Sequence, residues 1–126
     1  MSHIYVAADG DDVGRKIEFF IVMNQIDILS NFFNQFQISM LWFAEELSKR
    51  FQAEIVFNGG DSLLAKLQAS KAEISELEII RNEFFNISQM TISVGIGESP
   101  RQAYFALKLA KAAGKNRIEI FQECVK

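Results

Sequence analysis

The stretch "FNGGDSLLAKL", residues 57–67, decides the fold because it has the form of a β-hairpin. Gly59 and Gly60 can both adopt the positive φ angles that a two-residue hairpin loop needs, so we expect the turn at these glycines. The strand that follows is apolar through residues 63–65, yet it is opened by Asp61, a poor strand former. The sequence thus sets a carboxylate beside a loop whose backbone another molecule can approach closely.

The segments around the hairpin alternate between strands and helices. "IYVAA" (4–8) and "TISVGIG" (91–97) are short apolar runs typical of buried strands, and "RIEIF" (117–121) predicts a short final strand. The long apolar region 13–51 is too long for one strand and predicts two helices with a break near residues 24–30.

Two more helices are marked by their ends. Ser70 followed by Glu73 is a capping box and predicts a helix start, while Ser99 is the expected N-cap of a last helix that stops at Gly114. The resulting order is βααββαβαβ, with a hairpin held between two crossover helices. This order predicts an α+β fold with a ferredoxin-like, mainly antiparallel sheet and helices on one face.

Composition favours one globular domain that spans residues 1–126. The chain is 49% hydrophobic, and its net charge of −3 argues against an extended nucleic-acid surface. Cys124 is the single cysteine, which excludes an intrachain disulfide. Acidic residues follow the N-terminus closely, and no apolar run has the length of a membrane span. We therefore expect a cytoplasmic protein without a membrane segment.

Two carboxylates are expected at one edge of the sheet. Asp9 follows the first strand and Asp61 follows the hairpin turn, and these elements are neighbours in a split βαβ sheet. Two carboxylates at one spot repel each other unless a cation lies between them. Mg²⁺ fits such a place, because it needs one or two protein carboxylates and takes water and substrate phosphates as its other ligands. Gly59 and Gly60 would then let a phosphate or a base lie against the backbone.

Each motif has a simpler explanation when it is taken alone. "GGD" is more often a plain turn, "DGDD" (9–12) a solvated turn and helix cap, and "AKAAGKN" (110–116) a helix end with surface lysines. Their combination favours a site. The two lysines of the final helix could face the edge of the sheet that carries the carboxylates, with the charge that a triphosphate needs.

Four motifs in order, "YVAADGDDVG", "NGGDSLLA", "TISVGIG" and "ALKLAKAAGKN", resemble the GGDEF-type nucleotide cyclases and the polymerase palm of type III CRISPR complexes. The D-G-D-x-x-G opening is most similar to the stand-alone minimal CRISPR polymerase (mCpol) family. The resemblance covers nearly the whole chain. It implies a single polymerase/cyclase palm.

The resemblance also implies roles for individual residues. It places Mg²⁺, for which Mn²⁺ can substitute, on Asp9, on the carbonyl of Gly10 and on Asp61, with the two aspartates as catalytic residues. It assigns phosphate contacts to Lys111 and Lys115. The turn after the first strand would direct backbone N–H groups at the terminal phosphates, as a helix N-terminus can. Together with the hairpin tip, this turn supplies the other nucleotide contacts: Asp11, Asp12, Val13, Gly14, Arg15, Gly59, Gly60 and Ser62.

Three positions depart from the diguanylate cyclases. Ser62 stands where their motif has an acidic residue, so a second metal would have fewer protein ligands. Ile17 stands at the place of their guanine-reading Asn, and it cannot hydrogen-bond a guanine edge. We therefore expect Ile17 in an apolar base pocket that favours adenine. Their feedback motif R-x-x-D is also broken, because Arg50 is followed three residues later by Ala53.

The residues and the resemblance together predict an enzyme, a Mg²⁺-dependent nucleotidyltransferase that makes a cyclic di- or oligoadenylate from ATP, and the resemblance implies a role in antiviral defence signalling. One nucleotide per subunit suggests a two-fold homodimer, and a separate effector would read the product. A catalytically silent palm that binds nucleotide as a sensor or scaffold, a diguanylate cyclase and a ferredoxin-like interaction module are the alternatives. The base, the 2′–5′ or 3′–5′ linkage, the ring size, the number of metals and the regulation stay open.

Overall fold

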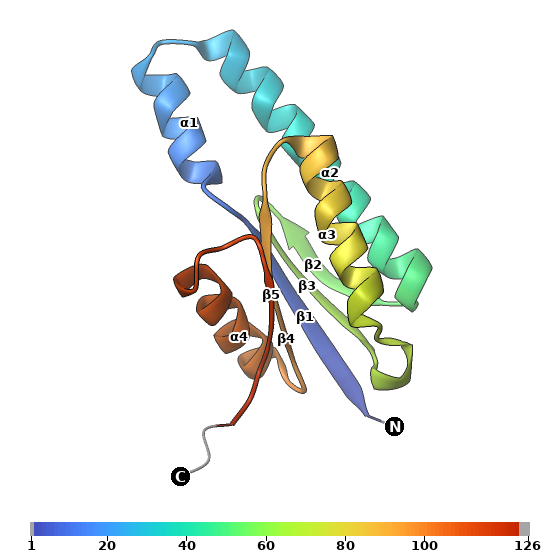
Figure 1. Ribbon diagram of the computed structural model, residues 1–126. Coiled ribbons are helices and arrows are strands. Elements are labelled where there is room, and N and C mark those ends of the chain that lie inside the picture. Colours follow the sequence, from blue (N-terminus) through green and yellow to red (C-terminus); the bar gives the residue numbers. More distant parts are fainter. Residues whose placement is uncertain (1, 124–126) are drawn as a thin grey trace.

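The computed structural model describes residues 2–123, so Cys124 lies outside the described residues (Figure 1). The helices and strands follow the predicted order βααββαβαβ, with one short 3₁₀ turn added. Their bounds are β1 His3–Gly10, α1 Val13–Val22, α2 Ile26–Phe51, β2 Glu54–Gly59, β3 Ser62–Gln68, the 3₁₀ turn Ala69–Lys71, α3 Ile74–Ser88, β4 Ile92–Gly97, α4 Pro100–Ala112 and β5 Ile118–Ile120.

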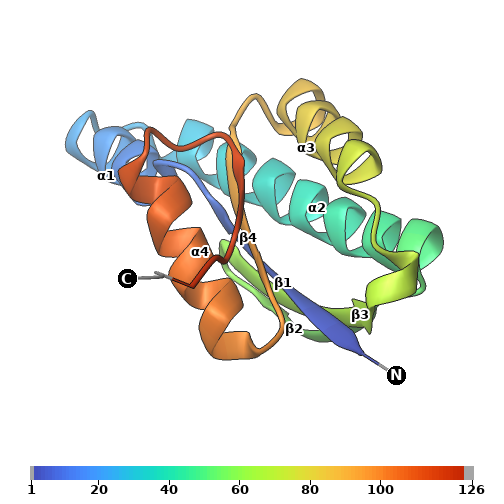
Figure 2. The ribbon, with the colours of Figure 1, turned by 60° about the horizontal axis from the view of Figure 1, so that its bottom comes forward.

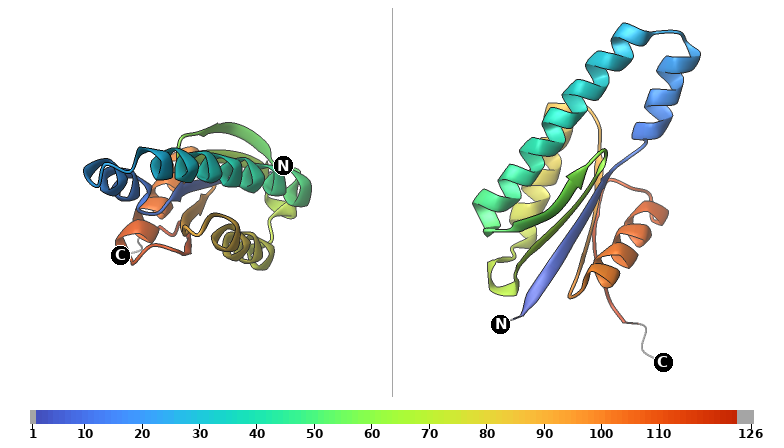
Figure 3. Two further views of the ribbon diagram at one scale, coloured as in Figure 1. Left: turned by 90° about the horizontal axis from the view of Figure 1, so that it is seen from above. Right: turned by 180° about the vertical axis from the view of Figure 1, so that it is seen from behind.

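The strands form one five-stranded sheet in the order β2-β3-β1-β4-β5. β1 is central and pairs antiparallel with both β3 and β4, and β2 pairs antiparallel with β3. β5 extends the sheet in parallel to β4. Because β3 lies between β1 and β2, the α1–α2 crossover spans a split βαβ unit, as Figure 3 shows from behind. The predicted α+β, ferredoxin-like, mainly antiparallel sheet is confirmed.

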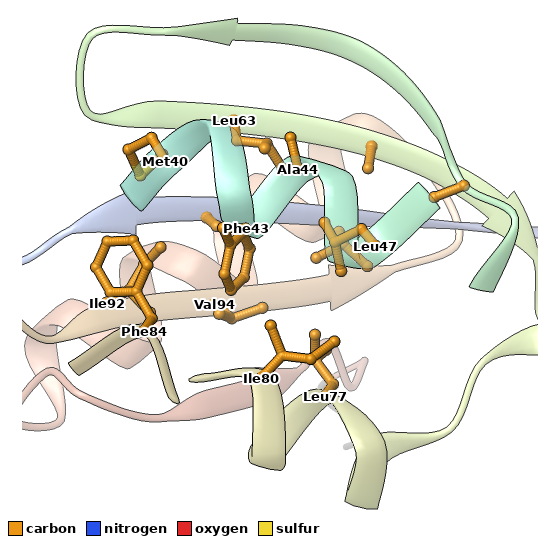
Figure 4. Close-up of a cluster of buried hydrophobic side chains, with 14 of the residues drawn as sticks. Met40, Phe43, Ala44, Leu47, Leu63, Leu77, Ile80, Phe84, Ile92 and Val94 are labelled. Carbon is orange, nitrogen blue, oxygen red and sulfur yellow. The ribbon is translucent and has the colours of Figure 1, made fainter. Parts of the chain in front are cut away.

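The main hydrophobic core lies between this sheet and the helices α2 and α3 (Figure 4). Every second residue of the central strands points into it, as the two-residue period of a strand requires. Phe43 of α2 and Phe84 of α3 meet edge to face with their ring centroids 5.8 Å apart. The other large side chains that are buried here are Phe36, Met40, Leu47, Leu63, Leu77, Ile80, Ile92 and Val94.

Helix α4 packs on the opposite face of the sheet, so the prediction that the helices lie on one face needs correction (Figure 2). Gly95 points away from the main core, between Val94 and Ile96, which belong to that core. A Cβ built at Gly95 would lie 2.2 Å from the backbone nitrogen of Leu107 and 2.3 Å from the carbonyl oxygen of Ala103. A strand without side chains here lets the helix backbone approach closely.

Replacing Gly95 by alanine should therefore push α4 away from β4. Its Cβ would clash with backbone atoms, which cannot move aside as a flexible side chain can. Overpacking of this kind costs about 1–3 kcal/mol, and here we expect the upper end. Urea unfolding measures the loss. Gly59→Ala is the matched control, because a Cβ there meets no described atom within 4 Å; equal stability of the two variants would contradict this packing.

The hairpin and the start of α3 differ in detail from their predictions. The two turn residues are Gly60 and Asp61, because Gly59 still belongs to β2 and Gly60 carries the positive φ of +61°. Asp61 therefore sits in the turn itself. The predicted capping box is wrong, since Ser70 lies in the 3₁₀ turn and α3 begins only at Ile74.

Other helix ends agree with their predictions. The side chain of Ser99 accepts a hydrogen bond from the N–H of Gln102 at 3.1 Å, as an N-cap does. The long apolar region is broken at residues 23–25, at the early edge of the predicted interval. Gly114 follows α4 with a φ of +121°, a conformation that glycine adopts at little cost.

The hairpin of α1 and α2 extends past the end of the sheet (Figure 1). Several large apolar side chains stay exposed on it: Phe19, Ile21, Val22, Met23 and Ile26. Between residues 2 and 123, no helix is both long and apolar enough to cross a membrane. An apolar surface of this kind is typical of a protein–protein contact.

Candidate active site

The end of β1 meets the hairpin turn at one edge of the sheet. Asp9 pairs with Ser62 across β1 and β3, and the Ser62 hydroxyl donates a hydrogen bond to Asp9 Oδ1 at 2.7 Å. The N–H of Gly10 donates to the carbonyl oxygen of Asp61 at 2.8 Å. The antiparallel register therefore places Asp9, Gly10 and Asp61 side by side, where sequence reasoning expected them.

The ionised form of the Asp61 side chain is disfavoured by its surroundings. Burial raises the pKa of Asp61 above 3.8, and the nearby charge of Asp9 raises it further. A second carboxylate thus stands where its own ionisation is opposed. A cation bound between the two groups would remove this opposition.

Lys111 of α4 brings a cation to the same oxygens. Its Nζ lies 3.0 Å from Asp9 Oδ2, 3.0 Å from the Gly10 carbonyl oxygen and 2.7 Å from Asp11 Oδ1. Burial alone would lower the pKa of Lys111, but its hydrogen bonds to Asp11 and Asp9 outweigh burial and raise the pKa above 10.5. The side chain of Lys111 therefore stays protonated at neutral pH and places a positive charge at the end of β1.

These oxygens fit a divalent metal such as Mg²⁺. The Asp9 carboxylate and the Gly10 carbonyl already converge on one cation, the Lys111 ammonium, and Asp61 adds a second carboxylate beside them. Within residues 2–123, no three His, Cys, Asp or Glu side chains gather into a complete metal site. Mg²⁺ does not need one, because water and phosphate oxygens complete its coordination.

Asp11 lies beneath this site instead of in a phosphate-binding turn, which corrects the prediction for this residue. It is 2% exposed, and its N–H already donates to the Thr91 carbonyl oxygen at 2.9 Å. Its carboxylate accepts hydrogen bonds from the hydroxyls of Thr91 and Ser93, both at 2.7 Å, and from the N–H of Asn116 at 3.0 Å. With Lys111 it joins the ends of β1, β4 and α4.

Replacing Asp11 by asparagine should cost about 3 kcal/mol of stability at pH 7, because it breaks a buried ion pair. Burial by itself would raise the pKa of Asp11, but hydrogen bonds from Lys111, Ser93 and Thr91 together lower it below 3.8. A lowered pKa stabilises the fold above 3.8, and this stabilisation is lost as pH falls through the lowered value. Urea unfolding at a series of pH values should show the two proteins converging in acid. A constant difference would contradict the role of the charge.

The start of α1 adjoins the same site. Asp12 is the N-cap with a φ of +60°, and Lys115 Nζ lies 2.6 Å from its Oδ1. The guanidinium nitrogen Nη1 of Arg15 lies 3.9 Å from the same Asp12 oxygen. Val13 is buried and Gly14 is exposed, and the first-turn amides have no partner within the helix, as at any helix start. Amides and two cations thus gather beside Asp12.

The other predicted contacts divide into two groups. Gly59 and Gly60 are exposed at the hairpin tip, where the Gln37 side chain donates to the Gly60 carbonyl oxygen at 3.0 Å. Ile17, in contrast, is half-buried and packs against the main core. The prediction that Ile17 lines a base pocket therefore has no support in this geometry.

Sequence reasoning missed two sets of residues. Thr91 just before β4 and Ser93 within β4 are polar at alternate positions of an otherwise apolar stretch, which is the signal that they share one face with a polar partner. Tyr104 and Lys108 of α4 line a groove that ends at Asp9. Their spacing from Lys111 is helical and could have placed them on its face.

Solved structures with the same architecture include diguanylate cyclase domains and Csm1-Csm4 cassettes. The chain is similar to the active GGEEF domain of a diguanylate cyclase from Vibrio cholerae, with a TM-score of 0.66, 14% identity, and coverage of 98% of this chain and 85% of that chain. It is similar to a Csm1-Csm4 cassette in complex with cA4, with a TM-score of 0.66, 18% identity, and coverage of 93% and 20%. It is also similar to the GGDEF domain of DgcB from Caulobacter crescentus in complex with c-di-GMP, with a TM-score of 0.59, 17% identity, and coverage of 94% of this chain and 78% of that chain.

The chain therefore has the palm fold that the GGDEF and GGEEF domains share with a Csm1-Csm4 cassette. The minimal CRISPR polymerase domain (mCpol) matches residues 5–121, and the chain belongs to this family. No match was found among curated proteins. The description of this family indicates a polymerase-like role.

Proposed function

We propose that this protein is a Mg²⁺-dependent nucleotidyltransferase that joins and cyclises ribonucleoside triphosphates. The observation that carries the proposal is the convergence of Asp9, Gly10 and Asp61 with Lys111 at one edge of the sheet. Membership of the minimal CRISPR polymerase family supports it. A ferredoxin-like module that only binds a protein partner would not need acidic and basic groups gathered at this edge.

The residues at this edge have different proposed roles. Asp9, Asp61 and the carbonyl of Gly10 would hold the metal, which lowers the pKa of an attacking hydroxyl and offsets charge on the phosphoryl oxygens. Lys111, beside the same oxygens, would offset negative charge on the α-phosphate. Lys115 and Arg15 hold the terminal phosphates at the start of α1, where a helix N-terminus favours anions.

The proposed chemistry is an in-line displacement repeated once for each bond. A ribose hydroxyl of one nucleotide attacks the α-phosphorus of a triphosphate, a phosphodiester forms, and pyrophosphate leaves while the hydroxyl proton passes to solvent. Two or more such steps close a ring.

A facing second copy of the chain would supply the other nucleotide, which makes a two-fold homodimer the expected form. The exposed apolar side chains of the α1–α2 hairpin are consistent with a subunit contact.

Adenine is the proposed base, and the product is a cyclic oligoadenylate such as cyclic di-AMP. The Csm1-Csm4 cassettes that share this fold were solved in complex with cA4, pppApA and cA3. Their fold and the family name suggest a signal in antiviral defence that a separate effector reads. The DgcB domains, solved with c-di-GMP, keep a diguanylate cyclase as the second candidate.

Incubation with all four NTPs at equal concentration, with Mg²⁺ or Mn²⁺, tests this proposal. Mass spectrometry should detect a cyclic adenylate, with one pyrophosphate released for each nucleotide incorporated, and EDTA should stop both. A product made mainly of guanosine would favour the diguanylate cyclase. Nucleotide binding without any product would identify a catalytically silent palm.

A further inference from the structure

A groove lies between α4 and the ends of β1 and β3. It is lined by Asp9, Ser62, Tyr104, Leu107, Lys108 and Lys111. Asp9 and Lys111 belong to the candidate active site, whereas Tyr104 and Lys108 have no part in the chemistry described so far. The groove therefore extends the site along α4, away from the start of α1.

The spacing of these residues places them on one face of α4. Positions 104, 107, 108 and 111 follow the i, i+3, i+4, i+7 pattern of a helix face. The buried alanines of α4, namely Ala103, Ala106 and Ala110, pack against the sheet. Tyr104 is 51% exposed, and Lys108 Nζ lies 5.2 Å from the centre of its ring. An aromatic ring and an ammonium group thus stand together in a groove that ends at the carboxylate of Asp9.

The order of side chains along α4 separates two regions. Lys115, past the end of α4, contacts Asp12 beside the start of α1, which is where the terminal phosphates are proposed to bind. Lys111 contacts Asp9 in the middle. Lys108 and Tyr104 follow on the other side, one and two turns earlier in the helix. A nucleotide in the groove would therefore approach the α-phosphate from the side opposite the leaving pyrophosphate, as in-line attack requires.

We propose that this groove is the subsite for the attacking nucleotide, with its base stacked on Tyr104 and its 5′ phosphate near Lys108. The inference rests on the proposed function. In the expected dimer this nucleotide keeps its own terminal phosphates on the facing copy. Its ribose hydroxyl forms the new bond to the α-phosphorus of the triphosphate at Asp9, the bond to pyrophosphate breaks, and the proton leaves to solvent. An exposed cation–π contact is weak, so a base can displace Lys108 from the ring.

Tyr104→Ala tests the stacking, and AMP is the probe because it has no terminal phosphates for Lys115 to hold. The dissociation constant for AMP should rise about tenfold or more in Tyr104→Ala, in line with base–aromatic stacking, while Tyr104→Phe keeps the ring and should bind like the wild type. Phe105→Ala is the matched control: Phe105 is 52% exposed and adjacent, but it does not line the groove.

The same variants separate this inference from the proposed function. With ATP as donor and labelled AMP as the attacking nucleotide, Tyr104→Ala should raise the KM for AMP and leave the maximal rate nearly unchanged. Equal AMP affinity in wild type and Tyr104→Ala, or an equal loss in Phe105→Ala, would overturn the groove assignment even if cyclic product forms. Absence of product from the wild type would instead overturn the proposed function, whatever the AMP binding shows.

Discussion

Replacing Asp61 by asparagine is expected to reduce pyrophosphate release from ATP by roughly 10²- to 10³-fold, because a loss of this size follows when a preorganised polar group is removed from a reacting centre. Asparagine keeps the shape of the side chain and loses the charge that would hold the metal. The assay is pyrophosphate release with saturating Mg²⁺. Turnover like that of the wild type would contradict the role given to Asp61.

The same substitution should leave the fold intact. Burial and the charge of Asp9 raise the pKa of Asp61. The protonated carboxyl group therefore stabilises the fold below pH 3.8, and this stabilisation is lost as pH rises through the raised pKa. At pH 7 and without metal, Asp61→Asn should therefore be as stable as the wild type or slightly more stable, within about 1 kcal/mol. Glu45→Gln, an exposed charge removal on α2, is the control for both measurements.

Replacing Lys111 by alanine should weaken ATP binding by about 100-fold while changing adenosine binding little. The attraction for phosphate must come from the lysine, because a helix C-terminus offers carbonyl groups and repels anions. Calorimetry with ATP and adenosine measures the two affinities. Lys49→Ala removes an exposed lysine elsewhere and serves as the control. Equal effects on both ligands would show that Lys111 is structural only.

Lys111 also stabilises the fold, which its sequence motif did not reveal. Its loss leaves the buried carboxylate of Asp11 without a counter-ion, which costs about 3 kcal/mol. The pKa of Lys111 is raised, so this stabilisation is present below pH 10.5 and is lost as pH rises through the raised value. Lys111→Ala should therefore unfold at lower urea concentration at pH 7, with a smaller difference from the wild type in strong alkali. Binding must be measured where the variant is folded.

Local signals predicted the elements of this fold, and long-range packing decided the rest. Ser99 formed the expected cap because its partner Gln102 is three residues away. Ser70 did not, because the chain leaves β3 through a 3₁₀ turn before α3 begins. The side of the sheet that α4 covers depends on Gly95 and its close contact with Ala103, which no local pattern expresses.

The sequence predicted only the part of the candidate site that follows from the order of the strands. Asp9 lies near the end of β1 and Asp61 lies in the turn just before β3, and these two strands are neighbours in a split βαβ sheet, so topology brings the residues together. Asp11 looked like a turn residue because its burial depends on pairing with Thr91 and Ser93, some eighty residues later. Ile17 was assigned to a base pocket by its count from Asp9, whereas helix α1 turns it toward the core.

The most direct test of the site is the coupling between metal and nucleotide. Affinity for a non-hydrolysable ATP analogue is measured with and without Mg²⁺, in the wild type and in Asp61→Asn, after correction for the binding of Mg²⁺ by the free analogue. If Asp9, Gly10 and Asp61 hold the metal, Mg²⁺ should tighten binding to the wild type by about tenfold or more, a coupling of ~1.4 kcal/mol, and the variant should lose this gain. An equal gain from Mg²⁺ in both proteins would mean that the metal is not bound at this edge of the sheet.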